Sequence, residues 1–531
     1  MSPAASETTT PGTVHFVGAG PGDEHMLTLR ATALLGAADL VVATAGVPFR
    51  RHCRDDAEIV GPDEAADLDT SVVTARLVAA ARDGRRVVRL LPGEPLLDGR
   101  AAPEAEAVRA AGVPFEIIPG VSAVTSVPAY AGIPLTGDGR TDVRVLDAAD
   151  PAVKWEEAGR GDGTLVISNA LAGIGDVAKA LTAAGRPADT PVALTCLGST
   201  TEQETVVSTL GRLTHDLRHA VLSEPAICVV GDVVAERERL SWFETKPLFG
   251  WRVLVPRTKE QAGDLSERLR AYGAVPEEVP TISVEPPRTP QQMDRAVRGL
   301  VTGRYQWVAF TSVNAVRAVR EKFEEYGLDA RAFAGVKVAA VGEHTAAALV
   351  AFGIKPDLVP PEDKQSSEGL LEVFPPYDAE LDPIDRVFAP RADIATDTLI
   401  AGLQDTGWEV DDITAYRTVR AAPPPEPVRE AIKGGGFDAV LFTSSSTVRN
   451  LVGIAGKPHK VTVIACIGPA TAKTAEEFSL RVDVQSPKAS VLALADELAR
   501  YGAQRRQKML DAGDAFRKPS HMRRGARRKK L

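Results

Sequence analysis

Aromatic residues and cysteines are scarce in this sequence, and each shortage narrows the class of protein. Aromatics make up 5% of the 531 residues, and the abundant Ala, Val and Leu are typical of α/β layers with buried strands and closely packed helices. The four cysteines, Cys53, Cys196, Cys228 and Cys466, are scattered without a CxxC pair. We therefore expect packing residues in a reducing cytoplasm, and no metal site.

Long apolar runs and a targeting signal are also missing. No run approaches the length of a membrane span, and residues 1–12 are polar and Thr-rich, which predicts a disordered N-terminus and no signal peptide. Residues 504–531 hold eleven Lys and Arg against two Asp, so we expect a basic, disordered tail. The net charge of −9 leaves an acidic body, which argues against a nucleic-acid enzyme.

One pattern occurs twice in the C-terminal half. Phe310–Val316 (FTSVNAV) and Phe442–Val448 (FTSSSTV) each follow a short apolar run, and each precedes a second apolar run that ends in a turn with Gly and Thr, at Gly342 and at Gly468. An apolar run, a Ser/Thr turn and an Ala/Val-rich periodic stretch predict strand, loop and helix. The repeat therefore predicts two similar α/β lobes.

The turns of both copies carry hydroxyls at predicted helix N-termini, beyond the carboxyl ends of strands. Ligands of α/β sheets bind at that edge, and backbone N–H groups at helix N-termini attract anions. The same hydroxyls can instead be plain N-caps. Both interpretations stay open, although two matching copies favour a ligand held between two lobes. The candidate substrate-binding residues are Thr311, Ser312, Asn314, Gly342, Ser444, Ser445 and Gly468.

The N-terminal half has its own ordered set of glycine-rich turns. Predicted strands at residues 14–17, 87–90 and 115–118 lead into GAGPGD (18–23), PGEP (92–95) and PGVSA (119–123), and AGIPLT (131–136) follows. Such turns let a cofactor approach the backbone. Together they resemble the tetrapyrrole methylase family, in particular uroporphyrinogen-III C-methyltransferase, over about residues 13–240.

This resemblance implies a two-part α/β domain over residues 13–243 that binds S-adenosylmethionine between its halves and can form a dimer. Matching positions imply cofactor contacts from Gly20, Pro21, Gly22, Gly93, Glu94, Leu97, Ser122, Ala123 and Gly198.

The chain departs from that family at the positions proposed to handle protons. Thr44 stands where the family carries an aspartate, and the family's Lys in a Gly-Lys-Arg run has no counterpart before Asp69. Gly137 and Asp138 replace a His-Arg pair. Methylation of a pyrrole carbon requires a proton to be removed. The methylase half is therefore predicted to be slow, altered in substrate, or a structural remnant.

After a predicted linker at residues 244–250, the motifs resemble uroporphyrinogen-III synthase over about residues 250–502. They are VPR (255–257), the two FTS turns, APRAD (389–393), AYRTV (415–419) and IGPATA (467–472). The resemblance implies a domain over residues 251–503 with two lobes, one formed by 251–285 with 418–503 and the other by 286–417.

The synthase resemblance implies cyclisation of hydroxymethylbilane, a linear tetrapyrrole with eight carboxylates, to uroporphyrinogen III with inversion of ring D. The reaction needs neither a metal nor a redox cofactor, and holding the flexible substrate is most of the catalysis. Tyr416 and Thr471 are the catalytic candidates. Tyr416 is either a weak acid for loss of the substrate hydroxyl or a buried structural tyrosine. Arg257 and Arg391 are candidate counter-charges or solvated surface arginines.

We thus expect an α/β chain in tetrapyrrole biosynthesis, a synthase fused to a methylase-like domain on the route to heme, siroheme or cobalamin. One competing hypothesis is that the methylase half only scaffolds the synthase. Another is a tetrapyrrole sensor that binds DNA through the basic tail, but that tail lacks a helix-turn-helix pattern. The expected partners are small tetrapyrroles, with neither membrane nor nucleic acid.

Overall fold

The computed structural model describes residues 12–44, 46, 49–61, 64, 69–97, 101–137, 141–219, 222–257, 259–514 and 516–522. Its contacts define two units, one of residues 1–251, 269–275 and 499–516, the other of residues 252–268, 276–498 and 517–531. Residues 1–11 and 523–531, for which we predicted disorder, lie outside the described residues. So does Asp138, one of the two residues that replace the His-Arg pair. Within the described ranges no helix has the length and apolar character to cross a membrane, and no cluster of His, Cys, Asp or Glu is placed to hold a metal.

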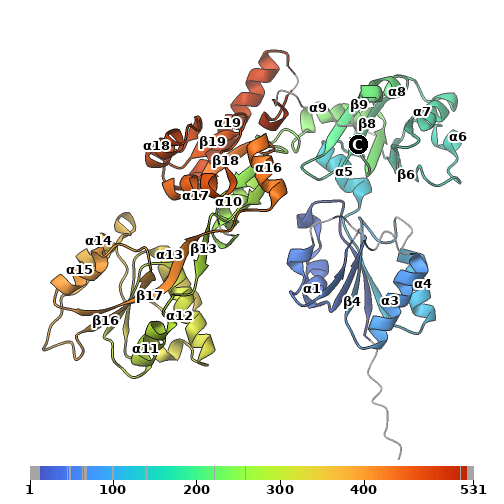
Figure 1. The fold of residues 1–531 in the computed structure, drawn as a ribbon. Coiled ribbons are helices and arrows are strands. Elements are labelled where there is room, and N and C mark those ends of the chain that lie inside the picture. Colours follow the sequence, from blue (N-terminus) through green and yellow to red (C-terminus); the bar gives the residue numbers. More distant parts are fainter. Residues whose placement is uncertain are drawn as a thin grey trace, which may run out of the picture. The chain divides into compact units, whose positions relative to one another are not determined.

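The first half of unit 1 is a parallel five-stranded sheet in the order β3-β2-β4-β1-β5. Its strands are almost continuously apolar because helices cover both faces, α3 and α4 on one side and α1 on the other (Figure 1). The strands predicted from the sequence are confirmed. The elements are β1 Val14–Gly18, η1 Glu24–Met26, α1 Leu29–Ala37, β2 Leu40–Ala43, η2 Arg50–His52, β3 Glu58–Val60, α3 Thr70–Arg82, β4 Val87–Leu91, α4 Ala101–Ala110, β5 Phe115–Ile118 and α5 Ala123–Ala131.

The second half of unit 1 is a mixed sheet in the order β6-β7-β10-β8-β9, in which β10 runs antiparallel to both of its neighbours. Helix α7 covers one face of this sheet through Val177 and Leu181. The elements are β6 Val143–Asp147, α6 Trp155–Ala158, β7 Thr164–Ser168, α7 Ile174–Ala183, β8 Pro191–Cys196, β9 Glu204–Thr209, α8 Leu213–Asp216, η3 Leu217–His219, β10 Ala226–Val230, η4 Asp232–Glu236 and α9 Arg237–Leu240.

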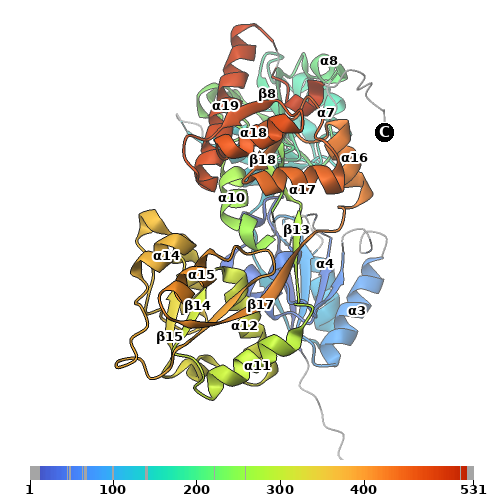
Figure 2. The same cartoon turned by 60° about the vertical axis from the view of Figure 1, so that its left-hand side comes forward.

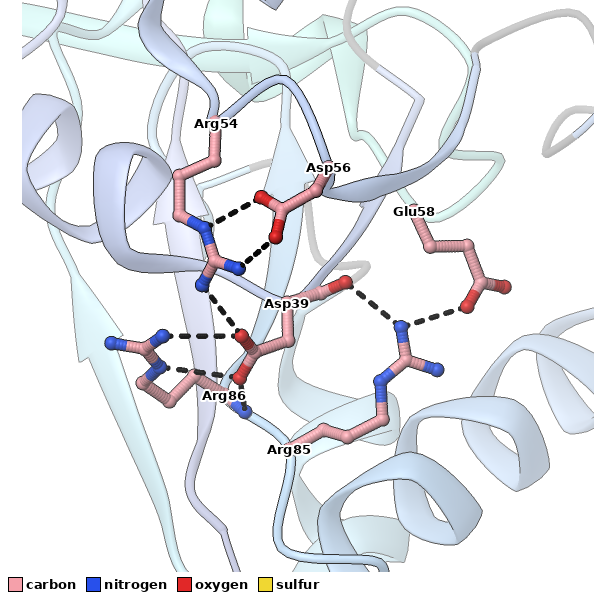
Figure 3. A network of polar contacts seen from close by, with 6 residues as sticks. All are labelled: Asp39, Arg54, Asp56, Glu58, Arg85 and Arg86. Carbon is pink, nitrogen blue, oxygen red and sulfur yellow. Dashed lines mark hydrogen bonds and ion pairs between the residues drawn. The ribbon is translucent and has the colours of Figure 1, made fainter. Parts of the chain in front are cut away.

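A network of charged residues lies at the end of the first sheet where its strands begin (Figure 3). The Asp39 carboxylate, just before β2, accepts hydrogen bonds from the backbone and guanidinium of Arg86 and from Arg54. Arg85 donates to the Asp39 carbonyl and pairs with Glu58. The bonds from Arg86, followed by that from Arg54, hold the pKa of Asp39 well below its usual range. The network ties three strand starts together at the edge opposite the glycine-rich turns.

The predicted linker, residues 244–250, is a packed segment, so that prediction is wrong. Leu248 and Trp251 are fully buried, the ring of Phe249 lies 5.2 Å from that of Phe243, and the Leu248 N–H donates to the Tyr272 carbonyl. The sequence Pro-Leu-Phe-Gly-Trp is apolar, and apolar surface is buried when a partner is available.

The basic tail begins later than predicted, because helix α19 runs without a break from Val491 to Asp511. Arg506 donates to the Glu244 carbonyl at 2.7 Å. Gly502 lies so close to Pro247 that a Cβ would sit 2.6 Å from the Pro247 carbonyl oxygen. Residues 504–511 therefore belong to a helix that packs in unit 1, and the prediction of a disordered tail is wrong for them.

Unit 2 contains two five-stranded sheets, in the orders β12-β11-β18-β19-β20 and β13-β17-β16-β14-β15. The predicted two-lobed division is present, but residues 282–285 form β13, which pairs antiparallel with the end of β17. That strand belongs to the second lobe, so the first crossing of the chain lies before residue 282. In the second lobe α11, α12 and α13 pack on one face of the sheet and α14 and α15 on the other (Figures 1 and 2).

The elements of unit 2 that follow in the chain are β11 Arg252–Val255, α10 Lys259–Ala271, β12 Val275–Glu278, β13 Ile282–Glu285, α11 Pro290–Val301, β14 Trp307–Phe310, α12 Val313–Glu325, η5 Ala330–Phe333, β15 Lys337–Ala340, α13 Glu343–Ala351, η6 Glu362–Lys364, α14 Ser367–Val373, β16 Arg386–Ala392, α15 Thr398–Asp405, β17 Glu409–Arg420, α16 Glu426–Gly434, β18 Ala439–Phe442, α17 Ser445–Ala455, β19 Val463–Cys466, α18 Pro469–Glu477, β20 Val482–Gln485, α19 and η7 Pro519–Met522. Parts of α10, β12 and α19 belong to unit 1.

Candidate functional sites

Three glycines bring together the carboxyl ends of β1, β4 and β5. A Cβ at Gly18 would lie 2.5 Å from the Gly93 carbonyl oxygen, and a Cβ at Gly120 would lie 2.2 Å from the same atom. Gly93 has φ +59° and exchanges backbone hydrogen bonds with Gly20. Side chains are excluded here by the close backbones, so a ligand at this edge meets backbone groups.

A strained loop from the second half of unit 1 lies against this glycine-rich edge. Leu197 and Ser199 have φ of 48° and 65°, although neither is glycine. Such conformations cost of order 1–3 kcal/mol and cluster at functional sites. A Cβ at Gly22 would lie 3.2 Å from the Ser199 hydroxyl oxygen. That hydroxyl is buried and has no hydrogen-bond partner among the described residues, so it can serve a ligand.

Helix α5 connects the two halves of this site. Ser122 caps its N-terminus by accepting from the Val124 N–H, which places Ala123 beside Gly93. Farther along the helix, the Tyr130 hydroxyl donates to the Asp23 carboxylate at 3.3 Å. Burial, followed by the Asp23 charge, raises the pKa of Tyr130 to about 12, so this hydroxyl keeps its proton.

Most of the predicted cofactor-binding residues therefore lie at one edge, but not all for the expected reason. Gly198 is packed, since a Cβ there would lie 2.4 Å from a methyl of Val127. The Glu94 carboxylate accepts from the Leu96 N–H at 2.8 Å and so stabilises its own turn, while Leu97 is 52% exposed. Together at the edge lie Gly20, Pro21, Gly22, Gly93, Ser122 and Ala123.

Thr44, which occupies the position of the expected carboxylate, sits over a buried ion pair. Arg89 of β4 and Glu104 of α4 are joined by hydrogen bonds of 2.7 and 3.0 Å, and both side chains are 3% exposed. The second amino group of the Arg89 guanidinium donates to the Thr44 hydroxyl and to the Val42 carbonyl, both at 3.4 Å. The position thus holds a neutral hydroxyl beside a cation.

In the second lobe of unit 2 the predicted catalytic tyrosine contacts a predicted binding residue. The Tyr416 hydroxyl lies 3.0 Å from Ser312 Oγ, and Ser312 also caps α12 by accepting from the Ala315 N–H at 3.1 Å. Tyr416 is 7% exposed. Thr311 is half-buried and Asn314 lies in the first turn of α12, so all four predicted residues gather at one helix N-terminus.

The N-terminus of the next helix, at Gly342, is partly occupied. The Gln365 side-chain oxygen accepts from the Glu343 N–H at 3.2 Å, and a Cβ at Gly342 would lie 2.7 Å from that oxygen. An amide oxygen therefore fills the position predicted for an anionic group.

The first lobe repeats the arrangement with different side chains. Ser444 caps α17 by accepting from the Thr447 N–H, and its hydroxyl lies 2.8 Å from that of Ser446. Ser445 donates to the Ala470 carbonyl at 3.1 Å, which links this turn to the start of α18, where Gly468 is the N-cap and Thr471 is buried. The caps Ser312 and Gly342 thus correspond to Ser444 and Gly468, as the internal repeat predicted.

The two candidate arginines differ in how far they are neutralised. Arg391 donates to Asp412 at 2.6 Å and to Asp397 at 2.8 Å, as well as to two carbonyls. Asp412 and then Asp397 raise its pKa above the usual range, so it is no free counter-charge and that prediction is wrong. Arg257 follows β11, and no ion pair reaches it from the described side chains. Burial lowers the pKa of Arg257, because desolvation disfavours the charged form.

Sequence reasoning missed three features of these sites. The Arg89–Glu104 pair was signalled only by a charged residue inside an otherwise apolar strand. The Tyr416–Ser312 contact joins residues 104 positions apart, for which no local pattern exists. The orphan hydroxyl of Ser199 depends on a left-handed backbone that Ser seldom adopts.

Comparisons with known proteins assign both halves of the chain. Residues 13–214 match the family model of tetrapyrrole (corrin/porphyrin) methylases, and residues 263–496 match that of uroporphyrinogen-III synthase HemD. The porphyrin biosynthesis protein HemD of Ruminiclostridium josui is 29% identical over 511 residues, which cover 92% of this chain and 98% of that protein.

Other relatives match a little under half of the chain. The siroheme synthase of Acinetobacter baylyi is 38% identical over 253 residues, 46% of this chain and 55% of that protein, so the chain spans about half the length of that relative. The crystal structure of uroporphyrin-III C-methyltransferase from Thermus thermophilus is 31% identical and covers 44% of this chain and 97% of its own, with a TM-score of 0.38.

Proposed function

Since this chain is a tetrapyrrole methylase domain fused to a uroporphyrinogen-III synthase domain, we propose that it cyclises hydroxymethylbilane to uroporphyrinogen III and carries a weakened methylating site on the same chain. The observation that carries the synthase assignment is the repeated Ser-capped helix N-terminus at the carboxyl end of β14 and β18, with Tyr416 beside one copy. Hydroxyls and backbone N–H groups there suit the substrate carboxylates.

In the proposed cyclisation Tyr416 gives its proton to the substrate hydroxyl. The C–O bond breaks, its electron pair leaves with the oxygen as water, and a cation remains on the substrate and a phenolate on Tyr416. The phenolate takes back a proton that the attacked pyrrole loses after the new C–C bond has formed, and that pyrrole regains its aromaticity. Thr311, Asn314, Ser445 and Thr471 position the acidic substituents, and Arg257 offers a positive charge that none of the described side chains pairs with.

The glycine-rich edge of unit 1 fits S-adenosylmethionine. Gly18, Gly93 and Gly120 allow three backbone segments to meet, so that a ligand there faces backbone groups, and the buried Ser199 hydroxyl still lacks a hydrogen-bond partner among the described residues. When bound, the cofactor supplies an electrophilic methyl group. The chain must then accept a proton from the methylated carbon, and Thr44 is far too weakly basic for that role. We therefore propose slow methylation, by a domain that forms a dimer in a cytoplasmic protein.

A second candidate function keeps the synthase and makes unit 1 a scaffold. It is favoured by the neutral hydroxyl of Thr44 beside Arg89. Calorimetric titration with S-adenosylmethionine separates the two, because a scaffold shows no saturable binding.

Incubation of the full chain with hydroxymethylbilane, with and without S-adenosylmethionine, tests the proposal. We expect the type III isomer in both samples, and a small methylated fraction by mass analysis only with S-adenosylmethionine. Spontaneous type I product alone would overturn the synthase assignment. Methylation as fast as cyclisation would overturn the weakened site.

A further inference from the structure

The Ser312 hydroxyl has two hydrogen-bond partners, and together they limit the direction in which it can donate its proton. One lone pair of Oγ accepts from the Ala315 N–H at 3.1 Å. The Tyr416 hydroxyl lies 3.0 Å away on the other side. A serine hydroxyl has one proton and two lone pairs, so its own proton remains free to point at Tyr416.

The backbone around Tyr416 is built to deliver its side chain to this contact. The pairing of β16 with β17 runs regularly to Arg391 opposite Thr414 and then shifts, so that Ala392 faces Tyr416 and Ala415 is the extra residue. A β-bulge of this kind re-aims the following side chain and recurs beside active sites. The Asp393 N–H donates to the Tyr416 carbonyl, and the Asp393 carboxylate accepts from the Thr418 N–H. Both bonds hold the bulged segment in place.

The direction of the Ser312–Tyr416 hydrogen bond decides whether Tyr416 can act as an acid. If Tyr416 donates to Ser312, its proton is turned away from the substrate. If Ser312 donates, the phenol proton is free, and the phenolate that forms is stabilised by the serine O–H and by the N-terminal end of the α12 dipole.

We propose that Ser312 is a positioning residue for Tyr416. Its hydroxyl donates to Tyr416 Oη and leaves the phenol proton directed at the departing substrate hydroxyl, a role that rests on the proposed synthase function. The equivalent cap of the first lobe, Ser444, faces the Ser446 hydroxyl. The tyrosine contact is thus an addition to the shared scaffold, and it goes beyond the N-cap role that both serines have.

A double-mutant cycle on the full chain tests this role, with kcat and KM measured for formation of the type III isomer. Ser312→Gly removes the hydroxyl, and glycine is itself tolerated at an N-cap. We expect kcat to fall roughly 10- to 100-fold, the loss of one hydrogen bond to a developing charge, with KM nearly unchanged. In the Tyr416→Phe background the same change should have no further effect on kcat. Ser312→Thr, which keeps the hydroxyl, should restore most of kcat.

The matched control is Ser366→Gly in the same lobe. Ser366 caps α14 by accepting from the Gly369 N–H at 3.1 Å, so its loss should affect stability as Ser312→Gly does and leave kcat intact. If Ser312→Gly raises KM and its effect multiplies with that of Tyr416→Phe, Ser312 binds substrate directly and the inference fails. Full activity of Tyr416→Phe would also overturn the inference while the synthase function stands. Absence of type III isomer from the unmodified chain would overturn the proposed function itself.

Discussion

Removing the carboxylate of Glu104 tests the buried ion pair beneath Thr44. Arg89 and Glu104 share two hydrogen bonds, and water reaches neither side chain, since each is 3% exposed. The guanidinium also donates to the Val42 carbonyl at 3.4 Å, but a carbonyl brings no compensating charge. Glu104→Ala therefore leaves a buried cation unpaired between the sheet and α4.

The size of the effect follows from burial. Deleting one partner of a buried pair costs roughly 3–5 kcal/mol, whereas replacing both by apolar residues is often nearly neutral. We expect Glu104→Ala to lower the free energy of unfolding of unit 1 by about 4 kcal/mol. Arg89→Met combined with Glu104→Leu should cost less than about 1 kcal/mol. Lys179→Ala, which breaks an exposed i,i+3 pair with Asp176, should cost less than about 0.5 kcal/mol.

The assay has to read unit 1 separately from unit 2. Urea unfolding of the full chain, followed by hydrogen exchange in peptides from β4 and α4, does so. Two results refute the reasoning: a loss below about 1 kcal/mol for Glu104→Ala, or a double variant as unstable as the single one. Either would mean that the site relaxes or admits water around the unpaired guanidinium.

Four other perturbations follow from the structure. Tyr416→Phe should slow formation of the type III isomer roughly 10- to 1,000-fold with little change in thermal stability; an unaltered rate would make Tyr416 a packing residue. Thr44→Asp should raise the rate of methylation seen by mass analysis, because Arg89, 3.4 Å from that hydroxyl, keeps a carboxylate ionised; no gain would show that the substrate pocket has changed too. A fragment of residues 246–522 should fold and cyclise the substrate, whereas one that ends at residue 503 loses the end of α19 and the bond from the Ser520 N–H to Asp438 and should melt at a lower temperature; equal melting points would contradict this. Asp39→Asn should lower the free energy of unfolding at pH 7 by roughly 1–2 kcal/mol. Because the folded pKa of Asp39 is depressed, this contribution is present above the unfolded pKa of about 3.9 and the gap to wild type should close as the pH falls below it.

The parts of the structure that depend on local pattern were predictable from sequence. Apolar runs before a Ser/Thr turn gave β14 and β18, and the hydroxyls at Ser312 and Ser444 are the N-caps of the helices that follow. Glycine-rich turns after β1 and β4 predicted the place where the backbones of unit 1 meet, because close backbone approach requires glycine.

The parts that depend on tertiary partners were not predictable. Arg391 has the sequence context of a free cation, and only the fold brings Asp412 against it. The apolar segment at Leu248 resembled a linker because its proline and glycine suggest turns, and its burial depends on Tyr272 and Gly502. The helix around Arg506 was overlooked, because the prediction of disorder used the net charge of residues 504–531 as a whole, and its packing depends on Glu244.

The two serine caps make the two lobes of the synthase half chemically different. Ser312 faces a phenol and Ser444 faces another serine, although matching backbones present them. In the proposed reaction the substrate is a row of four similar pyrrole rings with a leaving hydroxyl at one end only. Lobes of equal chemistry would accept such a row in either orientation. If Tyr416 is the acid, as proposed, only one orientation of the substrate is productive. The duplicated scaffold would then match the repetition in the substrate, and Tyr416 would determine which end reacts.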